Sequence, residues 1–314
     1  MKVISHGSQV PSVSDGKTVW TESGATEATA WPAAFIGFLA ELNEPLELKE
    51  LHFDSESNWV SVKHGRFGSR VIWTREINLP QSWRVSAFHS NRVVTLESFD
   101  STSLERADGI AVDGKNFLAP LAIQTADCLA VAMTAENDSQ IRFASCFHAG
   151  WRGFTGAIQH NAMQLLKSAV SSQKKETKPA FDIFITIGPA IAGKCYPCGE
   201  DVLNAFRQHH AQSLKPLPGW SDKHDQVFWE MLRFGPTAET GKVYPDLQAL
   251  MCLELHALGV PLKGITVFRD DTFGSSHWPS HRRAMAQGLP RAGRLITHLC
   301  PPTCPQVTNH ASRS

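Results

Sequence analysis

The chain has 314 residues, of which 42% are hydrophobic and 19% are charged, and its formal net charge is zero. This length and composition predict a globular protein with a sizeable core, and a neutral chain lacks the basic field that attracts nucleic acid or acidic membranes. No segment approaches the roughly eighteen consecutive apolar residues of a membrane span. The first residues lack the apolar core of a signal peptide, and the seven cysteines are odd in number and scattered. We therefore expect a cytoplasmic protein with free thiols that binds neither nucleic acid nor membranes.

The first fifty residues are the least specified part of the chain. Ser, Thr and Gly dominate the first thirty, and a mixed apolar stretch follows from Ala33 to Leu48. We interpret residues 1–50 as a divergent N-terminal extension or small subdomain and residues 51–299 as the main domain. Residues 300–314 are rich in proline and are expected to be a frayed tail.

Strands and helices of moderate length are predicted beyond that boundary. Alternating apolar residues or short apolar runs predict strands at residues 59–63, 71–77, 84–89, 93–96, 118–124, 129–133, 141–147, 181–187 and 264–268. Helical spacing of apolar residues predicts helices at residues 158–169, 200–210 and 247–258, the last with Asp246 as N-cap and Gly259 at its end. The polar segments 171–178 and 211–226 are predicted to be loops. Because strands and helices mix without a strict βαβ rhythm, the predicted fold class is α+β.

Cys128 and His148 each lie next to small residues at the end of an apolar segment. A single cysteine in such a place is most often a small buried hydrophobe, and a single histidine can merely end a strand. The two together favour a functional site. A catalytic metal site needs a third protein ligand and keeps an open position, and His89, at the end of a predicted strand, is the best candidate.

Zinc suits a set of two histidines and one cysteine, and a zinc-bound water titrates near neutrality. Copper accepts the same donor set, usually with a weak axial ligand. A reducing cytosol and the need for an open position favour zinc. The alternative without a metal is a Cys128 thiolate that His148 activates.

Several charged residues near these donors are candidates for substrate binding. Arg152 follows His148 closely and is suited to a bidentate contact with phosphate or carboxylate. Arg282 and Arg283 form a second basic cluster, although a short basic run is usually a solvated face. Asp127, which precedes Cys128, is a candidate general acid or base.

Other motifs in the sequence are weaker. Cys195 and Cys198 form a CxxC pair that could hold a structural zinc with Cys300 and Cys304, but the second pair lies in the proline-rich tail. The H-x-E signature of base deaminases is missing, since Ala149-Gly150 follows His148. The sequence contains no Walker loop and no GxGxxG motif.

Taken together, the motifs resemble the YfiH-type laccase-domain family. The resemblance rests on Thr125-Ala126-Asp127-Cys128-Leu129, His148-Ala149-Gly150-Trp151-Arg152-Gly153 and Ile187-Gly188-Pro189-Ala190-Ile191, and it covers roughly residues 83–299. Further segments similar to the family pattern are Arg106-Ala107-Asp108-Gly109, Tyr244-Pro245-Asp246-Leu247, Ser280-His281-Arg282-Arg283 and Gly293-Arg294.

The resemblance implies a four-layer α/β/β/α fold with mixed β-sheets and a zinc ion bound by His89, Cys128 and His148. Members of the family have been described as purine nucleoside phosphorylases, peptidoglycan-editing factors and polyphenol oxidases. The resemblance also implies phosphorolysis of adenosine, inosine and methylthioadenosine, with some deamination of adenosine.

We therefore predict a cytoplasmic zinc enzyme whose partners are a purine nucleoside and phosphate. The predicted catalytic residues are Cys128, His148, Arg152 and Asp127, and the predicted phosphate-binding residues are Arg152, Arg282 and Arg283. The alternatives are an amidase that edits peptidoglycan precursors, a copper polyphenol oxidase and a degenerate paralogue without catalysis. The last is favoured by one departure from the family pattern, because its N-terminal R-x-G-G-V-S motif, with a substrate-contacting arginine, has no clear counterpart here.

Overall fold

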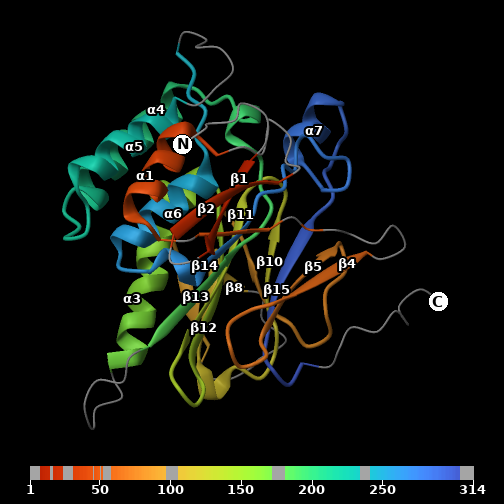
Figure 1. The fold of residues 1–314 in the computed structure, drawn as a ribbon. Helices are drawn as coiled ribbons and strands as arrows, with labels where there is room; N and C mark the ends of the chain where they lie inside the picture. The colour runs from red at the N-terminus through yellow and green to blue at the C-terminus, as the bar shows by residue number, and fades with distance from the viewer. Residues whose placement is uncertain are drawn as a thin grey trace.

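The computed structural model of the chain describes residues 8–14, 17–23, 31–44, 46–49, 51, 58–96, 105–171, 181–233 and 241–304. Two mixed β-sheets lie against each other, and most of the helices cover one side of this pair (Figure 1). The predicted α+β class with mixed sheets is confirmed. None of the described helices is both long enough and apolar enough to cross a bilayer.

The larger sheet has seven strands. Their order is β3 (Glu47–Lys49), β14 (Ile265–Phe268), β13 (Asp182–Ile187), β11 (Leu129–Glu136), β12 (Ile141–Ala149), β9 (Gly109–Asp113) and β7 (Val93–Thr95). The central strand β11 is buried along its whole length. Val131 and Met133 face the helices, whereas Ala130 and Ala132 face the second sheet. A strand covered on both faces has no polar face, which explains the continuous apolar run in the sequence.

The smaller sheet has six strands. Their order is β4 (Trp59–Lys63), β5 (Arg70–Arg75), β15 (Leu295–Cys300), β10 (Leu121–Thr125), β6 (Trp83–Ser86) and β8 (Glu105–Arg106). Trp73 of β5 meets Phe268 of β14 with ring centroids 4.9 Å apart, so an aromatic contact joins the two sheets. A separate hairpin is formed by β1 (Ser8–Ser14) and β2 (Lys17–Ser23).

The helices pack mainly on the outer face of the seven-stranded sheet. They are α1 (Ala33–Leu42), α2 (Trp151–Thr155), α3 (Ile158–Ser171), α4 (Glu200–His209), α5 (Asp222–Leu232), α6 (Leu247–Ala257) and the short α7 (His281–Ala286). Helix α6 is the most deeply buried. As predicted, Asp246 caps it by accepting a hydrogen bond from the Ala249 N–H, and Gly259 follows it with a φ of +93°.

Two predictions for particular segments are wrong. The predicted loop 211–226 contains a π-helical turn (His210–Leu214) and the start of α5. Its polar composition hides the helix start, because the apolar residues that define the buried face, such as Phe228 and Met231, come later. The predicted strand 84–89 ends at Ser86, and the chain then turns around a buried carboxylate.

The N-terminal segment contributes to the main core within the described residues. Phe35, Phe38 and Leu39 of α1 belong to the larger buried cluster, and β3 pairs with β14. The predicted domain boundary at residue 50 stays a prediction. Most of the predicted loop 171–178 and residues 305–314 of the predicted tail lie outside the described residues.

Candidate metal centre

The structure brings the three predicted metal ligands together from three separate segments of the chain. His89 follows β6, Cys128 lies in the turn between β10 and β11, and His148 is near the end of β12. Their donor atoms all lie within 4.8 Å of one another. Cys128 Sγ is 4.0 Å from His89 Nε2, and the two imidazole ring centroids are 4.9 Å apart. His148 is buried and His89 is exposed, so the cluster opens to solvent on the His89 side.

A buried carboxylate, Asp108, positions two of these ligands at once. Its Oδ1 accepts a hydrogen bond from His148 Nδ1 at 2.8 Å, and its two oxygens accept the backbone N–H groups of Phe88, His89 and Ser90 at 2.7 to 3.3 Å. Because Nδ1 of His148 is engaged, Nε2 is the nitrogen available to a metal. Sequence reasoning assigned no role to Asp108, although the Arg106-Ala107-Asp108-Gly109 segment had been noted.

The backbone of the site is held in sparsely populated conformations. His89 has a φ of +63° and Asp127 a φ of +85°, and such non-glycine residues cost about 1–3 kcal/mol unless their surroundings fix them. The hydrogen bond from the His89 N–H to Asp108 is one such constraint. Gly150 leaves the space that the donors need, because a Cβ there would lie 2.8 Å from Cys128 Sγ and 3.0 Å from His89 Cδ2.

The electrostatics of the cluster favour a thiolate. Burial raises the pKa of the Cys128 thiol, but His148 and His89 outweigh it and hold that pKa at about 6. Burial lowers the pKa of His148, but Cys128 and Asp108 outweigh it and raise that pKa to about 9. Metals bind cysteine as the thiolate. Two imidazoles and one thiolate in mutual reach therefore fit a zinc ion, and copper accepts the same donors.

Asp127 has both carboxylate oxygens occupied by protein groups. Oδ1 accepts a hydrogen bond from the Thr272 hydroxyl at 2.6 Å, and Oδ2 accepts the backbone N–H of Arg282 at 2.7 Å. The residue is buried. It therefore ties the start of α7 to the turn that carries Cys128, and this bonding does not favour the predicted role as general acid or base.

The predicted phosphate-binding arginines differ in how they are engaged. Arg283 donates to the carbonyl oxygens of Thr272, Phe273, Ser275 and Trp278 and so shapes the loop before α7. The Arg282 guanidinium lies 5.2 Å from the ring centroid of Tyr196. The Arg152 guanidinium is exposed and lies 4.2 Å from the ring centroid of Trp151. Arg152 and Arg282 are thus better placed to meet an anion than Arg283.

Tyr196 is a further residue of this region that sequence reasoning missed. Burial raises the pKa of its phenol, and the nearby thiols of Cys198 and Cys128 raise that pKa further. In the sequence, Tyr196 is marked only by its position inside the CxxC pair of Cys195 and Cys198, which indicates a cysteine motif and no role for the tyrosine.

The four-cysteine zinc site, which the sequence supported only weakly and which was not predicted, is not formed in the part of the chain that the structure describes. Cys195 donates instead to Asp271 Oδ2 at 3.3 Å. Across the described residues, only two groups of three His, Cys, Asp or Glu side chains are close enough to hold a metal, and neither contains Cys195, Cys198, Cys300 or Cys304.

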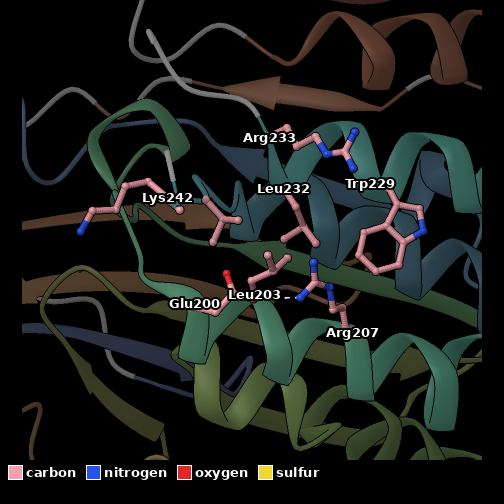
Figure 2. Close-up of a pocket in the computed structure, with 9 residues that line it drawn as sticks. Glu200, Leu203, Arg207, Trp229, Leu232, Arg233 and Lys242 are labelled. Atoms are coloured by element: carbon pink, nitrogen blue, oxygen red, sulfur yellow. Dashed lines mark hydrogen bonds and ion pairs between the residues drawn. The ribbon is translucent and has the colours of Figure 1, made fainter. Parts of the chain in front are cut away.

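A pocket of about 560 Å³ lies elsewhere, between α4 and α5. Figure 2 shows Leu203, Leu232 and Trp229 around it, with Arg207, Arg233 and Lys242 at its edges. None of the three candidate metal ligands lines this pocket. We place the functional site at the metal centre, because the chemistry of its donors is specific, whereas the pocket offers a mixed surface of apolar and flexible cationic side chains.

The mixed sheets and the His, Cys, His centre define a protein of the α+β class with a metal-competent site near the ends of its strands. The chain belongs to the family described as multi-copper polyphenol oxidoreductase laccase, whose model matches residues 68–300. The resemblance to YfiH-type laccase-domain proteins is thereby confirmed.

Relatives with assigned activities match part of the chain. "Adenosine deaminase RL5" of an unknown prokaryotic organism is 27% identical over 184 residues, which cover 56% of this chain and 60% of that protein. "Purine nucleoside phosphorylase YlmD" of Geobacillus stearothermophilus is 29% identical over 184 residues, which cover 58% of this chain and 57% of that protein. The matched part of the chain therefore spans about six tenths of the length of these two relatives.

Solved structures support the fold. The crystal structure of YlmD from Geobacillus stearothermophilus matches with a TM-score of 0.57 and 18% identity, covering 80% of this chain and 99% of that chain. The crystal structure of the Bacillus licheniformis hypothetical protein YfiH matches with a TM-score of 0.52 and 21% identity, covering 70% of this chain and 74% of that chain.

Proposed function

We propose that this protein is a zinc-dependent purine nucleoside phosphorylase that acts on adenosine, inosine and methylthioadenosine, with deamination of adenosine as a second activity. The observation that carries the proposal is the convergence of His89, Cys128 and His148, with donor atoms within 4.8 Å of one another. The names of several relatives, purine nucleoside phosphorylase and adenosine deaminase, support the same substrate class.

The proposed reaction transfers the nucleoside's ribosyl group to phosphate. A phosphate oxygen forms a bond to the ribose C1′ while the bond from C1′ to the base nitrogen breaks, and the base leaves with the bonding electrons and takes up a proton. The products are the free base and a sugar 1-phosphate, which is ribose 1-phosphate from adenosine or inosine and 5-methylthioribose 1-phosphate from methylthioadenosine. Such a reaction needs a site that binds an anion next to an uncharged base.

The chain's own residues supply that binding. His89, Cys128 and His148 would hold the zinc, which when bound supplies a Lewis acid. Arg152 and Arg282 would bind phosphate, since a guanidinium donates two parallel hydrogen bonds to it. The Tyr196 ring beneath Arg282 offers a flat face for the base. Asp108 orients His148 and the turn of His89.

The test is release of the sugar 1-phosphate by zinc-loaded protein, before and after removal of the metal with a chelator: ribose 1-phosphate from adenosine and inosine, and 5-methylthioribose 1-phosphate from methylthioadenosine. We expect release that is lost with the metal and restored by zinc, and that is lost in Cys128→Ala. Arg207→Ala, in the pocket between α4 and α5, is the matched control and should keep the activity. If zinc-loaded wild-type protein releases none from any of the three nucleosides, the proposal is wrong.

A copper oxidase is the second candidate, favoured by the family's description as a polyphenol oxidoreductase and by the ability of copper to use the same donors. The distinguishing measurement is metal analysis of protein purified without added metal, together with oxygen uptake in the presence of a phenol. Bound copper with oxygen uptake would favour the oxidase, and stoichiometric zinc with no uptake would favour the phosphorylase.

A further inference from the structure

A second group of metal-competent side chains is buried in the helix layer, away from the strand ends that carry the first centre. His160 comes from α3, His209 ends α4, and Glu254 lies in α6. Their donor atoms all lie within 4.8 Å of one another. The side chains of His209 and Glu254 are fully buried, and that of His160 is 18% exposed.

The distances in this group suit a single small cation. His209 Nε2 and Glu254 Oε1 form a hydrogen bond of 2.9 Å, which a cation would replace, and His160 Nε2 lies 3.4 Å from Glu254 Oε2. Zinc bonds to nitrogen and carboxylate oxygen are about 2.0–2.2 Å long, so neighbouring ligands of a tetrahedral ion are separated by about 3.3–3.5 Å. Only small shifts of the side chains would be needed to bring all three to one ion.

The hydrogen bonding is incomplete without such an ion. His160 Nε2 is buried and has no hydrogen-bond partner, although it faces the carboxylate. Buried polar atoms are normally satisfied. The carboxylate itself is held in place, because Gln159 Nε2 donates to Glu254 Oε2. A hydrogen bond that fixes a carboxylate from outside is typical of the partners that support metal ligands.

One ligand borders the surface. His160 lines a surface pocket of about 430 Å³ together with Met163, Lys167 and Leu258, whereas the donor atoms themselves are buried. A cation would therefore reach the group from this pocket when the His160 side chain moves.

We infer that His160, His209 and Glu254 form a second site for a divalent cation, with zinc as the best match to two imidazoles and one carboxylate. The ion links α3, α4 and α6, since each contributes one ligand. The His209 ring also packs against Phe154 of α2 at a centroid distance of 5.8 Å. Binding at this site thus stabilises the helix layer next to the segment that carries Arg152, and it does not depend on the proposed activity.

The experiment uses the full chain with Cys128→Ala and His148→Ala, which removes two ligands of the first centre. After stripping and dialysis against zinc, this variant is expected to retain one zinc per chain and to melt at a higher temperature than its stripped form. Cobalt is the second probe. It should bind wild-type protein with a thiolate charge-transfer band from Cys128 and bind the variant without that band.

Adding His160→Gln tests the second site itself. His160 is partly exposed, so the substitution should leave the fold intact, and unchanged circular dichroism and a retained cobalt–thiolate band in the single His160→Gln variant check this. Zinc binding to the triple variant should be weaker by more than about 100-fold, since the loss of an outer partner alone costs about 10- to 100-fold. Lys167→Gln, on the same helix and pocket, is the matched control and should leave binding unchanged.

Two outcomes would overturn the inference. One is retention of no zinc by the double variant, which would mean that protons rather than a cation balance Glu254. The other is zinc binding of equal strength with and without His160→Gln. Neither outcome bears on the phosphorylase proposal, which depends on the first centre.

Discussion

Asp108 positions two of the three ligands of the metal centre, because this one buried carboxylate accepts hydrogen bonds from the ring of His148 and from the backbone N–H of His89. In Asp108→Asn, an amide NH₂ replaces one of the two acceptor oxygens and meets N–H donors. We expect zinc affinity to fall by about 10- to 100-fold and the free energy of unfolding to fall by about 1–3 kcal/mol.

Competition with a chromophoric chelator measures the zinc affinity of this variant, and urea denaturation measures its stability. Asp182→Asn, at an exposed position at the start of β13, is the control for the same chemical change and should alter neither quantity appreciably. Unchanged zinc affinity in Asp108→Asn would show that the ligands are positioned without the carboxylate.

Replacing Gly150 tests whether the metal centre needs the space beside its donors, because the backbone conformation at this position does not require glycine. Its φ of −74° is accessible to any residue, so the only obstacle to alanine is the Cβ that would lie 2.8 Å from Cys128 Sγ. We expect Gly150→Ala to weaken zinc binding at the first centre by at least about tenfold, which corresponds to about 1.4 kcal/mol. Isothermal titration with zinc measures the effect.

Gly37→Ala is the matched control for that substitution. Gly37 lies in α1, and nothing lies within 4 Å of a Cβ placed there. Alanine is favoured over glycine in a helix by about 0.5–1 kcal/mol, so this variant should be slightly more stable and bind zinc as the wild type does. Equal zinc affinities of the two variants would contradict the assigned role of Gly150.

At the scale of elements, periodicity predicted most strands and the helices α3, α4 and α6, whereas it missed β15 and the helices α1, α2, α5 and α7. Helix α5 was missed because Pro, Lys, Asp and Ser precede and fill its first turn, while its buried face rests on later residues such as Val227 and Phe228. The clustering of His89, Cys128 and His148 was predictable because Cys128 and His148 lie at the ends of apolar segments and because the resemblance to the YfiH-type family implied all three ligands. The hydrogen bonds of Asp108 and the contact of Tyr196 with Arg282 were not predictable, because they join segments far apart in the chain.

Ser221 caps the N-terminus of α5, and a single substitution can test this cap. Ser221 Oγ accepts a hydrogen bond from the His224 N–H, and the His224 ring reaches back to the Ser221 N–H. Ser221→Ala should lower the free energy of unfolding by about 1 kcal/mol, as the loss of an N-cap does. Ser168→Ala, at an exposed position within α3, removes the same hydroxyl without a cap and should not destabilise. Urea denaturation of both variants decides whether the segment that looked like a loop is capped as a helix.

At the scale of the whole molecule, the seven-stranded sheet contributes side chains to two cores, and a polar contact joins it to the smaller sheet. His64, which follows β4 of the smaller sheet, makes this contact. Its ring lies 2.8 Å from Thr186 Oγ1 of β13 and 3.1 Å from Thr134 Oγ1 of β11. Burial lowers the pKa of His64 to about 3, so the folded protein keeps this ring neutral where an unfolded chain would protonate it.

The difference between the pKa of His64 in the folded and in the unfolded chain determines how stability changes with pH. Between about pH 6.5 and pH 3 the unfolded chain binds a proton at this position and the folded chain does not, so stability falls as the pH falls, by up to about 1.4 kcal/mol per pH unit for one group. Burial also lowers the pKa of His298 to about 4, so His64 accounts for part of the total slope.

His64→Gln removes the titrating ring while keeping a donor and an acceptor at that position. We expect this variant to be less stable than the wild type at pH 7.5 and to lose stability less steeply between pH 6.5 and pH 4.5, as measured by urea denaturation at several pH values. His277→Gln, at an exposed position, should follow the wild-type slope. Parallel slopes for His64→Gln and the wild type would mean that His64 takes up its proton without unfolding, and that the contact between the two sheets opens in acid while the rest of the molecule stays folded.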